Sequence, residues 1–240
     1  MAGSDCTGTA ASASRGRRAS LVITGAFFSM LLTGNLATPL YKGYSGRFGF
    51  SPAVLGLIFA TYAIVLIPSL LLFGQLSDQL GRRHVIAAGL GVAIVGAVLF
   101  AAADSVGWLF AARATQGLAQ GMLSGAATAA LSELVPEGGA RRAALLATLA
   151  QSGGSASGPL LAGMLAQWAP DPRALPFLVG IATTGVAIVA LRVVPETAGG
   201  KEGGWRVQRP RVPSEIRGDF IRVGLTAAAV WAVAAGCFCP

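Results

Sequence analysis

Residues 74–86 read GQLSDQLGRRHVI and form a short charged segment between two long apolar ones. The residues before position 74 and those after position 85 are almost all Leu, Ile, Val, Ala, Gly and Phe. Charged side chains are costly inside a bilayer and belong in the water beside it. The pattern therefore predicts a hairpin between two transmembrane helices, with the charged segment outside the membrane.

The composition of the 240-residue chain also indicates a protein embedded in a lipid bilayer. Hydrophobic residues make up 54% of it and charged residues only 12%, whereas soluble domains carry roughly 25% charge. The net charge of +8 raises the alternative of nucleic-acid binding. However, the basic residues recur between apolar runs and do not gather on one helix face, so we expect no nucleic-acid partner.

Six apolar segments predict six transmembrane helices in an all-α bundle over residues 21–194. Residues 1–20 are expected to form a disordered cytoplasmic tail, and residues 195–218 a cytoplasmic linker. A seventh span is expected to start at residue 219, with the chain ending inside or just past it at Pro240. The six predicted spans are residues 21–41, 52–73, 85–103, 108–134, 143–168 and 177–194.

The distribution of basic residues predicts the orientation of the bundle. Most of the 18 Lys and Arg residues lie in segments on the same side as the N-terminus. On the other side lie Lys42, Arg47 and Arg173, and Arg113 lies within a span. Because cytoplasmic loops carry the excess of positive charge, the N-terminus is predicted to be cytoplasmic.

The residues that usually carry catalysis or bind metals are scarce. The cysteines are Cys6, Cys237 and Cys239, and the single histidine is His84. Their spacing fits neither a disulfide framework nor a zinc site, and no acidic pair lies in the middle of a span. We therefore expect a protein that is not an enzyme and that has no metal site and no cofactor.

Three of the polar residues within the predicted spans are candidates for a cavity or for coupling: Asn35, Arg113 and Gln116. Asn35 can line a polar cavity, or its amide can bond to a neighbouring helix. Arg113 costs about 2.5–3.5 kcal/mol to insert and needs a partner, a cavity or a ligand. The alternative is that Arg113 reaches the nearby interface with its long side chain. Gln116 lies three residues further on and is also a candidate for a cavity or for coupling.

The hairpin at residues 74–86 resembles the signature loop of the major facilitator superfamily, G-x-L-[SA]-D-x-x-G-R-[RK]. The alternative is an ordinary solvated loop. The resemblance implies that Asp78 and Arg82 join Glu133, at the end of the fourth span, in a charge network that closes the cytoplasmic side. The matching residues are Gly74, Leu76, Ser77, Asp78, Gly81, Arg82 and Arg83.

Two further segments are similar to patterns of this family. Arg113–Gly117 reads RATQG and is similar to R-x-x-Q-G, which implies a place for Arg113 in the cavity or in proton transfer. Residues 154–163 read GSASGPLLAG and look like the antiporter pattern G-x-x-x-G-P-x-x-G-G, with Ala162 in place of one Gly. The alternative is generic close packing of small residues. The matching positions are Gly154, Gly158, Pro159 and Gly163, and Pro195-Glu196-Thr197 is a weaker family-like feature.

The resemblance implies two inverted three-helix repeats and a transporter of which this chain is the N-terminal half. We expect a truncated or frame-shifted chain, with residues 219–240 beginning a second bundle. The expected function of the complete protein is export of small, apolar or drug-like molecules across the plasma membrane by alternating access, as an antiporter that can be driven by protons. The alternatives are a half-size transporter that acts as a homodimer, a non-transporting membrane protein and an inactive fragment.

Overall fold

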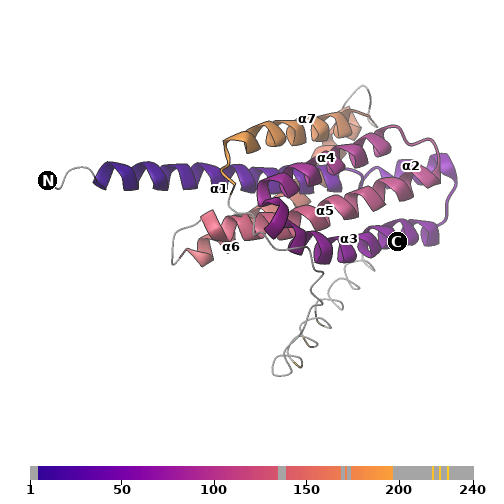
Figure 1. Ribbon diagram of the computed structural model, residues 1–240. Helices are drawn as coiled ribbons and strands as arrows, with labels where there is room; N and C mark the ends of the chain where they lie inside the picture. The colour runs from indigo at the N-terminus through magenta and orange to yellow at the C-terminus, as the bar shows by residue number, and fades with distance from the viewer. Residues whose placement is uncertain are drawn as a thin grey trace. The chain divides into compact units, whose positions relative to one another are not determined.

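The computed structural model describes residues 5–134, 139–168, 171, 174–196, 218, 222 and 226 (Figure 1). Over these residues the protein is all-α, which confirms the predicted fold class. Residues 1–205 and 206–240 form separate units, and the bundle lies in the first. Its helices are α1 (Asp5–Asn35), α2 (Tyr41–Phe48), α3 (Pro52–Leu80), α4 (Arg82–Ala101), α5 (Val106–Leu134), α6 (Ala140–Trp168) and α7 (Ala174–Ala190), followed by the 3-10 turn η1 (Leu191–Val193).

The charged hairpin is much tighter than the sequence pattern suggests. Helix α3 begins with Pro52 in its first turn, where the Ser51 hydroxyl accepts a bond from the Val54 N–H. The helix then continues past the predicted end at residue 73 to Leu80, because residues 74–80 contain no residue that must end a helix. Gly81 alone makes the turn, with φ of 92°, and α4 begins at Arg82.

The helical structure at the start of the chain differs from the prediction. Residues 5–20 are helical and form the first part of α1, where a disordered tail is expected. This stretch is rich in Ala and contains no Pro, so nothing in it prevents a helix from extending beyond the apolar segment. Figure 1 shows this part of α1 extending past the other helices of the bundle.

The segment predicted as a loop at residues 42–51 also contains a helix, α2. Tyr41 and Tyr44 are its buried residues. The Tyr44 hydroxyl donates a hydrogen bond to the Phe100 carbonyl at 2.8 Å, which ties α2 to the end of α4. Tertiary packing of this kind stabilises a helix too short to be stable alone.

Among the described residues, three helical stretches are long and apolar enough by themselves to cross a membrane: α3, α4 and Ala174–Val193. Helices α1, α5 and α6 have 29 to 31 residues and are longer than the roughly 20 needed for a span. They are less apolar because much of their buried surface consists of Ala, Gly and polar residues. The six predicted spans therefore differ in apolarity more than the sequence pattern suggests.

Each long helix of the bundle packs against at least two others. Helix α3 lies against α5, and α1 lies against α6. Helix α4 packs between α5 and α7, and α1 also contacts α5 and α7. The core includes a stacked pair of rings, Phe100 of α4 and Phe177 of α7, with centroids 5.5 Å apart.

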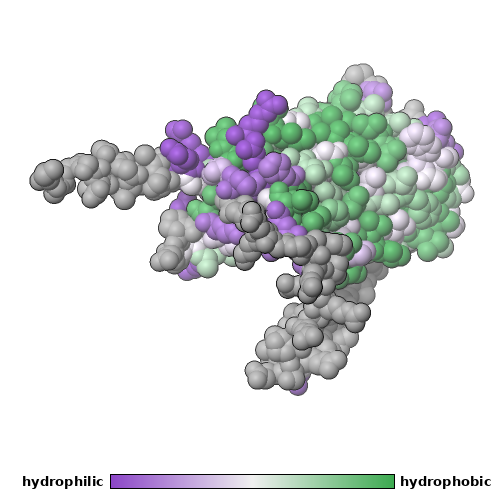
Figure 2. Space-filling view, in the orientation of Figure 1, coloured by the Kyte–Doolittle hydropathy of each residue, from purple (hydrophilic) through white to green (hydrophobic). Residues whose placement is uncertain are grey.

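The outer surface is apolar over most of the bundle. Ile64 and Ile67 of α3, Leu160 of α6 and Val186 of α7 each have more than 60% of their surface exposed. Figure 2 shows hydrophobic surface across the body of the bundle and hydrophilic surface gathered near its ends. A soluble monomer rarely exposes apolar area on this scale, so the surface indicates a bundle surrounded by lipid.

Candidate functional site

A three-residue charge cluster joins α3, α4 and α5 at one end of the bundle. Arg82 donates from Nε to Oε2 of Glu133 at 2.8 Å and from Nη2 to Oε1 at 2.6 Å. The same Nη2 lies 2.8 Å from Oδ1 of Asp78, four residues earlier. The Arg82 side chain is 12% exposed. A bidentate guanidinium–carboxylate pair fixes orientation as well as charge, so Arg82 holds the two helix ends against the start of α4.

A fourth residue, Glu196, completes this end of the bundle. Its carboxylate lies 3.2 Å from Nδ1 of His84 and accepts a bond from the Arg83 N–H at 3.3 Å. The N–H groups in the first turn of a helix have no partner within the helix, and the N-cap residue of α4, Gly81, has no side chain to accept from them. The Glu196 carboxylate takes that place for the Arg83 N–H. The Arg83 side chain donates to the Val194 carbonyl at 3.4 Å. These contacts attach the segment after α7 to the hairpin.

Gly81 is the position where these contacts leave no room for a side chain. A Cβ there would lie 2.7 Å from Cδ and Oε2 of Glu196. The sequence pattern singles out Gly81 for its turn and Glu196 only as part of a weaker family-like ending. Only the folded structure places the two together, because they are far apart in the chain.

A second polar site lies inside the bundle around Arg113. The residue is 5% exposed, so it does not reach the interface, and that alternative is excluded. Nε donates to the Tyr41 hydroxyl at 2.6 Å, and Nη1 donates to Oε1 of Gln116 at 3.0 Å. The structure thus brings together two of the three residues predicted for a cavity or for coupling, Arg113 and Gln116, and it adds Tyr41.

Aromatic rings surround the Arg113 guanidinium. Its Cζ lies 4.7 Å from the ring centroid of Phe59, 5.2 Å from Tyr41, 5.7 Å from Phe100 and 6.0 Å from Tyr62. Such contacts stabilise a cation by about 0.5–2 kcal/mol each. The sequence pattern gives no sign of this arrangement, because the four rings come from α2, α3 and α4.

Among the described residues, no hydrogen bond joins Asn35 to Arg113. Its Nδ2 donates to the Leu31 carbonyl of its own helix at 2.8 Å. Its Cβ lies at the contact between α1 and α6, 2.9 Å from where a Cβ on Gly158 would be. The side chain is therefore part of the helix contact there.

Two of the three glycines of the antiporter-like pattern lie where helices approach closely. A Cβ on Gly154 would lie 2.6 Å from the Phe28 carbonyl oxygen, and one on Gly158 would lie 2.6 Å from that of Leu32. Both glycines therefore allow the close approach of α6 to α1. Gly163 has nothing within 4 Å of such a Cβ, so its absence of a side chain is not required by packing. Pro159 lies inside α6.

A second row of glycines, on α5, packs against α3 and is not among the predicted site residues. A Cβ on Gly117 would lie 2.5 Å from the Tyr62 carbonyl oxygen, and one on Gly121 would overlap Ser69. A Cβ on Gly125 would lie 3.2 Å from Cα of Gly74, which explains the need for a small residue at that motif position. The signal is present in the sequence as three glycines spaced by four.

No group of three or more His, Cys, Asp and Glu side chains that could hold a metal ion is found among the described residues. The site chemistry is that of hydrogen bonds and ion pairs.

An apolar helical bundle with a charge cluster at one end and one arginine buried among aromatic rings defines a polytopic membrane protein. The chain belongs to the Major Facilitator Superfamily, whose family model matches residues 22–239. The family is one of membrane transporters, a class without enzymatic activity.

Its relatives and structural neighbours are transport or resistance proteins. The chain is 33% identical over 145 residues to the puromycin resistance protein pur8 of Streptomyces alboniger, covering 60% of this chain and 29% of that protein. It is 31% identical over 183 residues to the inner membrane transport protein YajR of Escherichia coli (strain K12), covering 72% and 38%. The chain thus spans well under two thirds of the length of these relatives.

The same architecture is found in a solved structure of the family. The crystal structure of the human organic anion transporter MFSD10 (TETRAN) superposes with a TM-score of 0.64 at 20% identity. The match covers 81% of this chain and 51% of that one. At this level of identity the likeness shows a shared fold.

Proposed function

We propose that this chain forms the N-terminal bundle of a small-molecule exporter that works by alternating access, with a second bundle completing the transport path. Family membership and relatives that include a puromycin resistance protein support export of drug-like molecules. The share of those relatives that the chain covers supports a further bundle in the working transporter. Protons driving the export as an antiport, and a location in the plasma membrane, belong to the same proposal.

The observation that carries the mechanism is the Arg82 cluster. Arg82 and Asp78 belong to the first three spans, and Glu133 belongs to the fourth, so the cluster fastens one predicted three-helix repeat to the other. The pairing of α3 with α5 and of α1 with α6 is the symmetric exchange that two inverted repeats would produce. In the proposal, the intact cluster stabilises the state closed to the cytoplasm, and its opening exposes the cavity on that side.

The glycine contacts serve the same mechanism. Close contacts between backbones along α1 with α6, and along α3 with α5, give two stiff helix pairs that can move as units. Alternating access then requires rocking of bundles and a change at the charged end, while the helices themselves keep their shape.

The test uses the transporter in proteoliposomes, with efflux of puromycin and cysteine accessibility at the Arg82 end as two readouts. Arg82→Ala is expected to lower the transport rate at least tenfold and to raise accessibility from the cytoplasmic side. Arg82→Lys is expected to be only partly active, because Lys cannot form the bidentate contact. Arg142→Ala is the matched control, an exposed arginine at the same end of the bundle whose side chain has no hydrogen bond or ion pair with the described residues.

Two results would contradict the proposal. One is an Arg82→Ala variant with unchanged flux and accessibility. The other is the absence of flux above empty liposomes for the complete transporter, while it stays folded and binds ligand.

A further inference from the structure

Two hydrogen-bond donors at the Arg113 site have no partner among the residues that the structure describes. Nη2 of Arg113 and Nε2 of Gln116 are both fully buried and make no hydrogen bond to any of these residues. Both side chains are more than nine-tenths buried, with 5% and 4% of their surface exposed. Unmade hydrogen bonds of buried donors are rare and costly in native structures, so this pair requires an explanation.

The site also carries an uncompensated positive charge. In the part of the chain that the structure describes, neither Asp nor Glu forms an ion pair with Arg113. The neighbouring rings and the Tyr41 hydroxyl stabilise the guanidinium in part. They cannot supply the negative charge that a buried cation ordinarily has beside it.

A carboxylate satisfies both requirements at once. It brings one negative charge and two acceptor oxygens, which matches one charged and one neutral donor close together on the same helix face, at positions 113 and 116. A neutral carbonyl would leave the charge unpaired. A cation would add to it.

We propose that Arg113 and Gln116 anchor the carboxylate of the transported molecule, which makes organic anions with an aromatic or alkyl body a substrate class of this protein. This inference rests on the proposed transport function. Arg113 Nη2–H and Gln116 Nε2–H donate to the carboxylate oxygens, and the rings of Phe59 and Tyr62 contact the body of the molecule.

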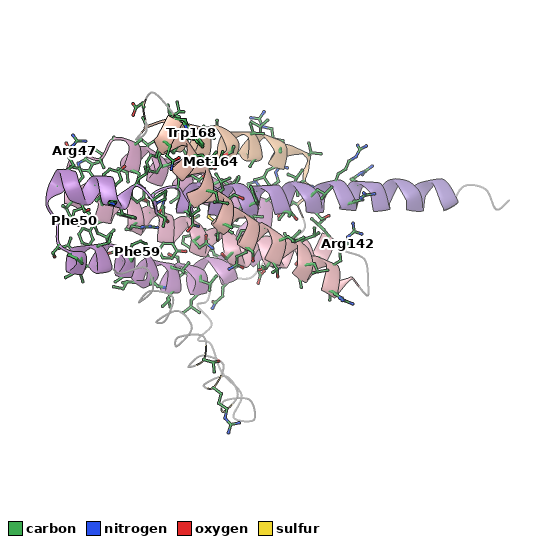
Figure 3. All side chains as sticks on the ribbon, turned by 180° about the vertical axis from the view of Figure 1, so that it is seen from behind. Arg47, Phe50, Phe59, Arg142, Met164 and Trp168 are labelled. Carbon is green, nitrogen blue, oxygen red and sulfur yellow. The ribbon has the colours of Figure 1, made fainter. Side chains whose placement is uncertain are left out.

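Access to the donors requires a ring to move. Phe59 is the ring nearest the guanidinium, at 4.7 Å, and it is 41% exposed. Its place on α3, at the surface of the bundle, is visible in Figure 3. Because Phe59 is partly exposed, rotation of its ring is the movement that the proposal assigns to the opening of the site. The described conformation is thus the one with the donors covered.

The experiment measures equilibrium binding of radiolabelled benzoate to the 240-residue chain in lipid nanodiscs, with benzyl alcohol as the neutral probe and empty nanodiscs as the blank. The unmodified chain is expected to bind benzoate, with unlabelled benzoate competing and benzyl alcohol failing to compete. Gln116→Met removes the Nε2–H donor and keeps a side chain of nearly equal size, and it is expected to raise the Kd for benzoate roughly tenfold or more.

Gln116→Glu is the decisive variant. Its carboxylate would lie where Oε1 of Gln116 already accepts from Arg113 at 3.0 Å, and would supply the missing charge from within the protein. We expect this variant to be folded, with thermal stability at or above that of the unmodified chain, and to lose benzoate binding. Gln151→Glu makes the same chemical change at an exposed position of α6 and is expected to bind benzoate normally.

Three outcomes overturn the inference: no saturable benzoate binding by the unmodified chain, equal competition by benzyl alcohol, or unchanged binding by folded Gln116→Glu. A flux assay separates this from failure of the proposed function. Puromycin efflux without benzoate binding would leave transport intact and remove the anion site. Benzoate binding by the chain, with no flux by the complete transporter, would keep the anion site and remove the transport function.

Discussion

At the scale of single residues, Gly81 meets two independent demands. Its φ of 92° is rarely adopted by residues with a side chain, and the Glu196 carboxylate occupies the space where a Cβ would be. We predict that Gly81→Ala destabilises the protein by about 1–3 kcal/mol, measured as thermal or denaturant unfolding in detergent. Gly91→Ala is the control on the same helix, because nothing lies within 4 Å of its Cβ, and it is expected to be neutral or slightly stabilising.

A double variant separates the two demands on Gly81. Removing the carboxylate with Glu196→Ala relieves the steric part of the Gly81→Ala cost and leaves the backbone part. The two changes should therefore be non-additive by at least about 0.5 kcal/mol, with the double variant more stable than the sum predicts. Strict additivity would show that Glu196 is not seated at Gly81 in the folded protein.

At the scale of helices, the contact of α5 with α3 depends on the row of glycines on α5. A Cβ on Gly121 would overlap Ser69 and lie 2.7 Å from the Leu70 nitrogen, and neither backbone can yield without separating the helices. We predict that Gly121→Ala destabilises the bundle by about 1–3 kcal/mol or more, and that it lowers the yield of folded protein in size-exclusion chromatography. A neutral result would mean that α3 and α5 lie further apart than described.

A similar prediction concerns the antiporter-like segment, residues 154–163, where α6 contacts α1. Gly158→Ala would place a Cβ 2.6 Å from the Leu32 carbonyl oxygen, whereas Gly163→Ala meets nothing within 4 Å. The first substitution is expected to destabilise the protein by about 1–3 kcal/mol and the second to change its stability by less than about 1 kcal/mol. Equal effects of the two, compared in one thermal unfolding series, would show that the segment acts through something other than helix contact.

These helix contacts also show what the sequence could and could not predict. The charged turn at Gly81 and the pairing of Arg82 with Asp78 and Glu133 were predictable, because charge and glycine have narrow roles beside a membrane. The buried face of α3 was not predictable, since only Ile58, Ser69 and Ser77 are buried on a helix of 29 residues. Lipid and protein core both favour apolar side chains, so hydrophobic periodicity does not indicate which face of a membrane helix is buried in the protein. Small residues mark the helix contacts instead.

At the Arg113 site, the sequence predicted the polar residues Arg113 and Gln116 but not the side chains that surround them. Two polar residues three apart inside a span indicate a buried polar site, and Arg113 and Gln116 do lie together. The aromatic rings around them come from positions 41, 59, 62 and 100, brought together by the fold. No spacing along the chain records that arrangement, nor which donors it leaves unpaired.

At the scale of the whole molecule, the ends of the bundle differ in charge, and this difference predicts its orientation. Arg142 at the start of α6 and Arg47 in α2 lie at opposite ends (Figure 3). Arg142 belongs to the end with the greater number of basic residues in its predicted loops, which should face the cytoplasm. With Cys6, Cys237 and Cys239 replaced by Ser, a cysteine at position 47 is expected to react with an impermeant maleimide in intact cells. A cysteine at position 142 should react only in inside-out vesicles or after permeabilisation. Labelling of position 142 from outside would reverse the orientation and would place the Arg82 cluster on the outer face, where it could not close the cytoplasmic side.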